Sequence, residues 1–137
     1  CAGFSNTPTL SVAGFQTANA PAHTGNVGLE FTLPFGDQWS FFARTDASYQ
    51  GTRYAEVYNF AETGDSLRYD ARLGLRGDEW TFTIWGRNVG NERSADSVVR
   101  FFDPDSRSPI GVPTFARAYQ VHYPDGRQIG LTAAYRF

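Results

Sequence analysis

Apolar and polar residues alternate along five segments of this chain, and this period of two limits its fold more than any other feature. In the clearest segment, residues 67–76, every odd position is apolar or aromatic and every even position is Arg, Asp or Gly. Successive side chains of a β-strand point to opposite faces, so each segment predicts a strand with one apolar and one polar face. No long stretch has helical periodicity. The predicted strands cover residues 26–33, 39–50, 67–76, 80–88 and 127–137.

The connections between these strands alternate in length. Short turns occupy residues 34–38 and 77–79, whereas long polar loops occupy residues 51–66 and 89–126. Short turns at one end of the strands and long loops at the other are typical of outer-membrane β-barrels.

Two further segments refine this organisation. Residues 1–23 are rich in small and polar residues and predict the remainder of another external loop, so that residues 24–137 hold the barrel strands. Within the second long loop, Val98 to Phe102 and Phe115 to Val121 predict strand extensions or a small hairpin.

A soluble antiparallel sheet also alternates, and it competes with the membrane interpretation. Two features favour the membrane. Arg and Asp crowd the polar face, which suits a water-filled lumen, and Trp39 and Trp80 begin strands beside short turns, where an aromatic girdle would lie. We expect an all-β fold, an antiparallel transmembrane β-barrel segment that is incomplete on its own, because single-chain barrels need at least about eight strands.

Charge suggests how the strands pair, because opposite charges favour facing positions. Between strands 39–50 and 67–76, a register that places Arg44 opposite Asp70 also places Asp46 opposite Arg68. Between strands 67–76 and 80–88, a register that places Asp70 opposite Arg87 leaves Asp70 between two arginines. A register shifted by two residues would oppose like charges and is disfavoured. The expected lumen charge network comprises Arg44, Asp46, Arg68, Asp70, Arg72 and Arg87.

Composition excludes several function classes. All twelve basic residues are Arg, they are scattered over 137 residues, and the net charge is -2, so no nucleic-acid partner is expected. No apolar run approaches the roughly 18–20 residues of a membrane helix. The histidines His23 and His122 lie in loop-like stretches and nothing has metal-ligand spacing. We therefore expect no enzyme activity, no metal and no cofactor.

The single cysteine, Cys1, permits two interpretations. In an external loop it could belong to a disulfide with a partner upstream, as in an oxidising compartment. Alternatively, an N-terminal cysteine is what remains when a bacterial lipoprotein is cleaved and acylated.

Aromatic residues and arginines mix in both long loops. This mixture suits a polar ligand with rings or carboxylate groups, although loop aromatics also pack on one another. The candidate ligand-binding residues are Arg53, Tyr54, Tyr58, Arg100, Phe102 and Arg117.

Three segments together resemble TonB-dependent receptors of the outer membrane. Residues 127–137, which end in Tyr-Arg-Phe, resemble the last strand of that family, and residues 80–92 resemble its penultimate strand and the Asn-Leu-Thr-Asp-Glu ending. Asn-Ala-Pro at residues 19–21, with the strand that follows, resembles the entry into an earlier strand. The resemblance covers about residues 19–137. It departs at residues 89–91, Val-Gly-Asn in place of Leu-Thr-Asp, and at an insert around residues 122–126.

The resemblance implies a plug domain inside a 22-stranded barrel in the outer membrane of a Gram-negative bacterium. Such a receptor takes up a nutrient such as a siderophore, vitamin or saccharide, driven by the TonB complex of the inner membrane. The implied partners are outer-membrane lipid, the rest of the same barrel and its plug, and TonB through a segment outside these residues. The alternative is a surface lipoprotein or a small non-transporting outer-membrane β-barrel that acts as a binding or structural module.

The last strand also resembles the signal that the barrel-assembly machinery recognises, which implies that machinery as a partner. Apolar residues alternate up to a final aromatic, and the strand would be recognised as an unpaired edge. An ordinary amphipathic strand would show the same alternation. The residues concerned are Ile129, Leu131, Tyr135 and Phe137.

Overall fold

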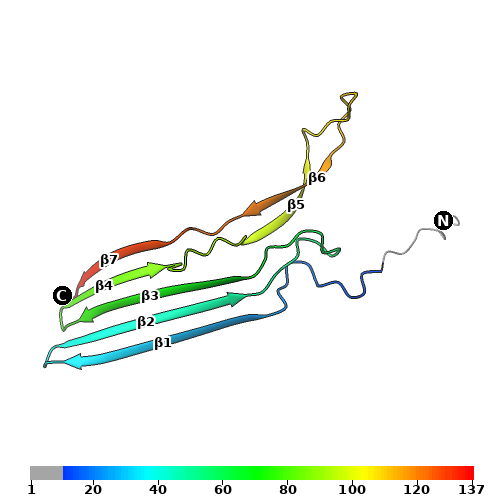
Figure 1. Ribbon diagram of the computed structural model, residues 1–137. Helices are drawn as coiled ribbons and strands as arrows, with labels where there is room; N and C mark the ends of the chain where they lie inside the picture. Colours follow the sequence, from blue (N-terminus) through cyan, green and yellow to red (C-terminus); the bar gives the residue numbers. More distant parts are fainter. Residues whose placement is uncertain (1–10) are drawn as a thin grey trace.

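The computed structural model describes residues 11–137, and these residues form seven β-strands (Figure 1). Cys1, with both of its expected roles, lies outside the described residues. None of the described residues belongs to a helix that could span a membrane. The strands are β1 (Thr24–Phe35), β2 (Trp39–Gln50), β3 (Ser66–Arg76), β4 (Trp80–Arg87), β5 (Ser97–Asp103), β6 (Ala116–His122) and β7 (Gln128–Tyr135).

Five of the strands form one antiparallel sheet in the order β1-β2-β3-β4-β7. Strands β5 and β6 form a separate hairpin, which extends beyond β4 and β7 on the side of the long loops (Figure 1). The all-β fold and the five sheet strands were predicted by the alternation and are confirmed. Of the two alternatives for the second long loop, strand extensions or a small hairpin, the structure contains the hairpin. Within residues 11–137 the sheet is open, with β1 and β7 at its two edges.

The register between β2 and β3 differs from the one that charge predicted. Arg44 lies opposite Arg72, and Asp46 lies opposite Asp70, so the predicted Arg44–Asp70 pairing is wrong. The register between β3 and β4 is the predicted one, with Arg72 opposite Trp85, although the ladder ends at Ala71–Gly86, one residue before Asp70 and Arg87. Charges can be satisfied diagonally or along one strand, and exposed ion pairs contribute little to stability.

Ring packing accounts for the observed register. Phe42 lies opposite Gly74, and a Cβ at position 74 would lie 2.8 Å from the Phe42 ring. The Trp39 ring similarly lies 3.1 Å from where a Cβ of Gly77 would be. A shift of two residues would place Phe42 opposite Arg72, and the Phe42 ring would then no longer cover the backbone of Gly74.

The two faces of the sheet differ sharply in polarity. The pairing places the alternating apolar residues of all five strands on one face, where Leu29 is 68% exposed and Leu131 is 78% exposed. Among the described residues only two apolar side chains are buried, Phe42 and Val98. The apolar face therefore has no second layer of residues 11–137 packed against it. Its large side chains include Val27, Leu29, Phe31, Leu33, Tyr49, Leu67, Tyr69, Leu73, Leu75, Phe82, Ile84, Ile129 and Leu131.

Candidate functional site

The polar face carries a row of ion pairs across β1, β2 and β3. The Arg44 guanidinium donates hydrogen bonds to Glu30 at 3.2 Å and to both carboxylate oxygens of Asp46 at 2.9 Å. Arg72 reaches the same Asp46 diagonally, at 3.8 Å. The predicted charge network thus exists for Arg44, Asp46 and Arg72. It also includes Glu30, which occupies a polar position of β1 but was not among the residues predicted for the network.

The other members of the predicted network contact different groups. Asp70 Oδ1 accepts a hydrogen bond from the backbone N–H of Asn88 at 2.8 Å. The Arg87 guanidinium lies over the Trp85 ring, 5.6 Å from its centroid. Arg68 forms an ion pair with Asp96, which precedes β5. The six residues therefore share one face of the sheet without forming a single network.

Asp96 connects the polar face to both long loops. Its carboxylate pairs with Arg68, and its backbone carbonyl accepts a hydrogen bond from Arg53 of the first loop. Its backbone N–H donates to the carbonyl of His122, at the end of β6, at 2.7 Å. The base of the hairpin is thereby tied to β3 and to the 51–65 loop.

Asn88 fixes the point where the second long loop leaves β4. Its side chain is buried, and its Nδ2 donates to the backbone carbonyls of Glu92 at 2.9 Å and Asp125 at 3.0 Å. Its Oδ1 accepts from the backbone N–H of Glu92 at 2.8 Å. Asn88 has φ of 48°, a left-handed conformation that Asn adopts more readily than most residues. One side chain therefore holds both the departing and the returning segment.

The Glu92 carboxylate caps the turn that follows Asn88. Glu92 Oε1 accepts hydrogen bonds from the backbone N–H groups of Ser94 at 2.7 Å and Arg93 at 2.8 Å. Hydrogen bonding from Ser94, chiefly, lowers the pKa of Glu92 below its ordinary value. The ionised carboxylate is therefore the form that this turn stabilises.

A buried carboxylate joins the first loop to the hairpin. Glu56 is 8% exposed, and its Oε1 accepts a hydrogen bond from the Tyr119 hydroxyl at 2.6 Å. Arg100 Nη1 lies 3.4 Å from Glu56 Oε2, and Arg117 Nη1 lies 3.6 Å from Oε1. The hydrogen bond to Glu56 raises the pKa of Tyr119. The three partners lie on one face of the β5–β6 hairpin, because Arg100 pairs directly with Tyr119.

Aromatic rings flank this buried carboxylate. The Arg117 guanidinium lies 5.0 Å from the centroid of the Phe60 ring, and that of Arg100 lies 5.2 Å from the Phe102 ring. Arginine over an aromatic face gains a favourable cation–π contact. We name the set Glu56, Phe60, Arg100, Phe102, Arg117 and Tyr119 the loop cluster.

The predicted ligand-binding residues fall into two groups. Arg100, Phe102 and Arg117 belong to the loop cluster. Arg53 contacts Asp96, Tyr54 forms an isolated β-bridge with Glu62, and the Tyr58 ring lies 6.1 Å from the Phe60 ring. The structure thus joins the two predicted loop sets through Glu56 and Tyr119. Neither residue was selected from the sequence, where Glu56 stands beside aromatic residues without any motif to mark it.

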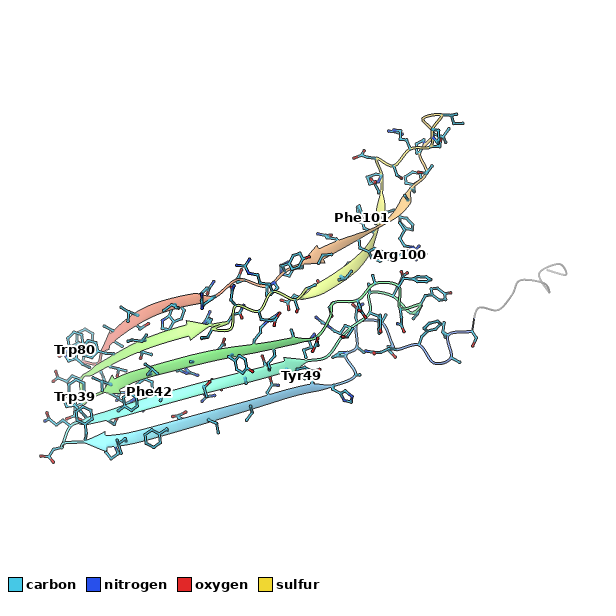
Figure 2. All side chains as sticks on the ribbon, viewed as in Figure 1. Trp39, Phe42, Tyr49, Trp80, Arg100 and Phe101 are labelled. Carbon is cyan, nitrogen blue, oxygen red and sulfur yellow. The ribbon has the colours of Figure 1, made fainter. Side chains whose placement is uncertain are left out.

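Aromatic rings gather at the short-turn end of the sheet, where Figure 2 shows Trp39 and Trp80. Trp80 stacks on Phe82 with ring centroids 5.7 Å apart and contacts Tyr135 at 4.8 Å. Tyr135 in turn contacts Phe137 edge-on at 5.1 Å. Of the residues expected to signal barrel assembly, Ile129, Leu131 and Tyr135 lie on the exposed apolar face of the edge strand β7.

No arrangement suited to metal binding occurs in residues 11–137, where no three His, Cys, Asp or Glu side chains gather. Comparison with known proteins found no matching family model, no similar curated protein and no similar solved structure.

Proposed function

We propose that this chain forms part of the wall and external loops of an outer-membrane β-barrel. The observation that carries the proposal is the continuous apolar face of the five-stranded sheet. Exposed Leu29 on β1, Leu73 on β3 and Leu131 on β7 belong to a single surface, opposite a face that carries arginines and carboxylates. In a transmembrane barrel the first face contacts lipid and the second lines the lumen.

Three further features support a membrane position. The aromatic cluster of Trp80, Phe82 and Tyr135 lies at the short-turn end, where rings would meet the lipid headgroups. Strands β1 and β2 have 12 residues each, enough to cross a bilayer at the tilt of barrel strands. The edges of β1 and β7 carry unpaired backbone groups, which in lipid need further strands of a barrel beside them.

We further propose that the barrel is a TonB-dependent receptor for active uptake of a nutrient such as a siderophore, vitamin or saccharide. This part rests on the resemblance of residues 19–137 to that family. The loop cluster supports it, because it holds both long loops together as one surface on which a ligand could be bound. Outer-membrane lipid, the rest of the barrel with its plug, the TonB complex and the barrel-assembly machinery are the proposed partners.

Labelling with a membrane-impermeant maleimide tests the membrane position. In the complete protein with Cys1→Ala, a cysteine is introduced at Ile110, in the hairpin tip, or at Asp78, in a short turn. On intact cells Ile110→Cys should react, whereas Asp78→Cys should react only after the outer membrane is permeabilised. Equal labelling of both cysteines on intact cells, or recovery of the protein outside the outer-membrane fraction, would contradict the proposal.

Uptake assays test the receptor part. A strain lacking the protein should fail to accumulate one nutrient from a panel of siderophores, vitamins and saccharides, and a protonophore should abolish that uptake in the parent strain. Outer-membrane localisation without any energy-dependent uptake would instead support the small non-transporting barrel.

A further inference from the structure

We propose that the polar face of β3 and β4 holds a binding site for a small anion that carries carboxylate or phosphate groups. The site is a hollow of about 340 Å³ whose lining includes Arg72, Arg87, Trp85 and Thr83, together with the carboxylates of Asp46 and Asp70. This inference rests on the proposed function, because a water-filled lumen would bring such a solute to the polar face. It adds a class of solute to that function.

The Trp85 ring gives the hollow a fixed wall. Trp85 lies opposite Gly130 of β7, and its ring covers that glycine so closely that a Cβ there would lie 2.3 Å from it. The indole N–H donates a hydrogen bond to Thr132 Oγ1 at 3.2 Å. A ring held by both contacts loses little further side-chain entropy when a ligand binds beside it.

The ring also positions one of the two arginines that line the hollow, Arg87. Arg72 is the cross-strand partner of Trp85, and Arg87 follows two residues later on the same face of β4, with its guanidinium over the indole. Guanidinium groups bind carboxylate and phosphate oxygens through pairs of N–H donors. Because Arg72 and Arg87 both line the hollow, their N–H donors are suited to bind one anion in it.

The two carboxylates that line the hollow already accept hydrogen bonds from other groups of the protein. Asp46 accepts three hydrogen bonds from Arg44, at 2.9 to 3.2 Å, and its contact with Arg72 is the longest ion pair found in residues 11–137, at 3.8 Å. Asp70 accepts the backbone N–H of Asn88. Within the same residues Arg87 forms no ion pair. The donors of Arg87 and most of those of Arg72 are therefore free for a ligand.

Calorimetric titration of the complete protein in detergent micelles tests the site, with citrate and inorganic phosphate as probes in separate arms. Arg72→Gln and Arg87→Gln should each weaken binding of at least one probe by about tenfold or more, as expected for loss of a charge-assisted hydrogen bond. The better probe identifies carboxylate or phosphate as the preferred group. Arg76→Gln is the matched control. Arg76 is exposed on the same strand and face, over the Phe42 ring, but it does not line this hollow.

Three results would overturn the site. Binding that is unchanged in Arg72→Gln and Arg87→Gln means that the probe binds elsewhere or not at all. An equal loss in Arg76→Gln means that only the general positive potential of the face matters. Binding of an acidic peptide, without binding of either small probe, would also contradict the proposal. The labelling experiment on the same variants separates failure of this inference from failure of the proposed function. A protein that has the expected topology but no arginine-dependent binding would refute the anion site alone.

Discussion

The ring of Trp85 lies directly across from Gly130, and it occupies the space that any side chain at position 130 would need. A Cβ on Gly130 would lie 2.3 Å from the indole, well inside van der Waals contact. The ring and the glycine therefore form one packing unit between β4 and β7. A side chain at position 130 would therefore displace the Trp85 ring.

Gly130→Val should destabilise the complete protein by about 1–3 kcal/mol, because the ring has to leave its position over the glycine. The measurement is the free energy of unfolding in detergent from a denaturant titration. Gly25→Val is the control, since no atom lies within 4 Å of the position of its Cβ. A similar loss in both variants would indicate a general effect of valine at a glycine position.

The register of β2 and β3 can be tested by cross-linking. With Cys1→Ala as background, Arg44→Cys combined with Arg72→Cys should form a disulfide, because the two positions are direct cross-strand partners. Arg44→Cys combined with Asp70→Cys should form little, since diagonal positions lie too far apart. Mass spectrometry under oxidising and reducing conditions measures both. A reversed preference would restore the register that charge predicted.

If the sheet is part of the proposed barrel, a charge placed on its apolar face should disturb folding in the membrane, whereas the same charge on the polar face should not. Leu131→Arg is expected to cost about 2–4 kcal/mol near the middle of a bilayer. Ala134→Arg, on the polar face of the same strand, should leave the amount of folded protein in the outer membrane close to that of the wild type. Equal tolerance of both would show that the face containing Leu131 does not contact lipid.

Glu56→Gln should release the first loop from the hairpin. The substitution keeps the shape of the side chain but removes the charge that Arg100 and Arg117 approach. Hydrogen exchange of residues 51–65 and of β5 should accelerate by about tenfold or more, as expected when a buried polar group loses charged partners. Glu62→Gln, an exposed residue of the same loop, should leave exchange unchanged. Unchanged exchange in Glu56→Gln would show that the loops are held by other contacts.

Acid should loosen the turn after β4. Because the folded pKa of Glu92 is lowered, its carboxylate contributes stability above its ordinary pKa of about 4.5 and loses it as the pH falls through the lowered value. Amide protection of residues 88–96 should therefore fall over that acidic range. Glu92→Gln should have low protection at neutral pH and lack this dependence, whereas Glu79→Gln, in a short turn, should behave as the wild type.

The main features of the sheet were predictable because they depend on local alternation. The period of two identified all five strands of the sheet, and the residues at 98–102 and 115–121 predicted the β5–β6 hairpin. Position on one face follows directly from odd and even numbering once antiparallel pairing is assumed. The membrane environment and the receptor function stay predictions.

The β2–β3 register and the loop contacts could not be predicted in the same way. Charge gave the β3–β4 register correctly but was a poor guide to the pairing of β2 with β3, because Arg44 bonds to Asp46 on its own strand and leaves no need for Asp70. The fit of Phe42 over Gly74 depends on shape, which a charge pattern does not record. The contact of Glu56 with Tyr119 joins residues far apart in the chain, and no spacing rule connects them.

The Phe42–Gly74 pair also restricts how relatives of this protein can diverge. Any side chain added at position 74 would lie within 2.8 Å of the ring and 2.1 Å of the backbone carbonyl of Phe82, so the glycine cannot change while its neighbours stay as they are. The ring at position 42 is free to shrink, but only by exposing the backbone beneath it. In an alignment of relatives, position 74 should therefore stay glycine even where position 42 is not aromatic, because the Phe82 carbonyl blocks a Cβ there whatever residue occupies position 42.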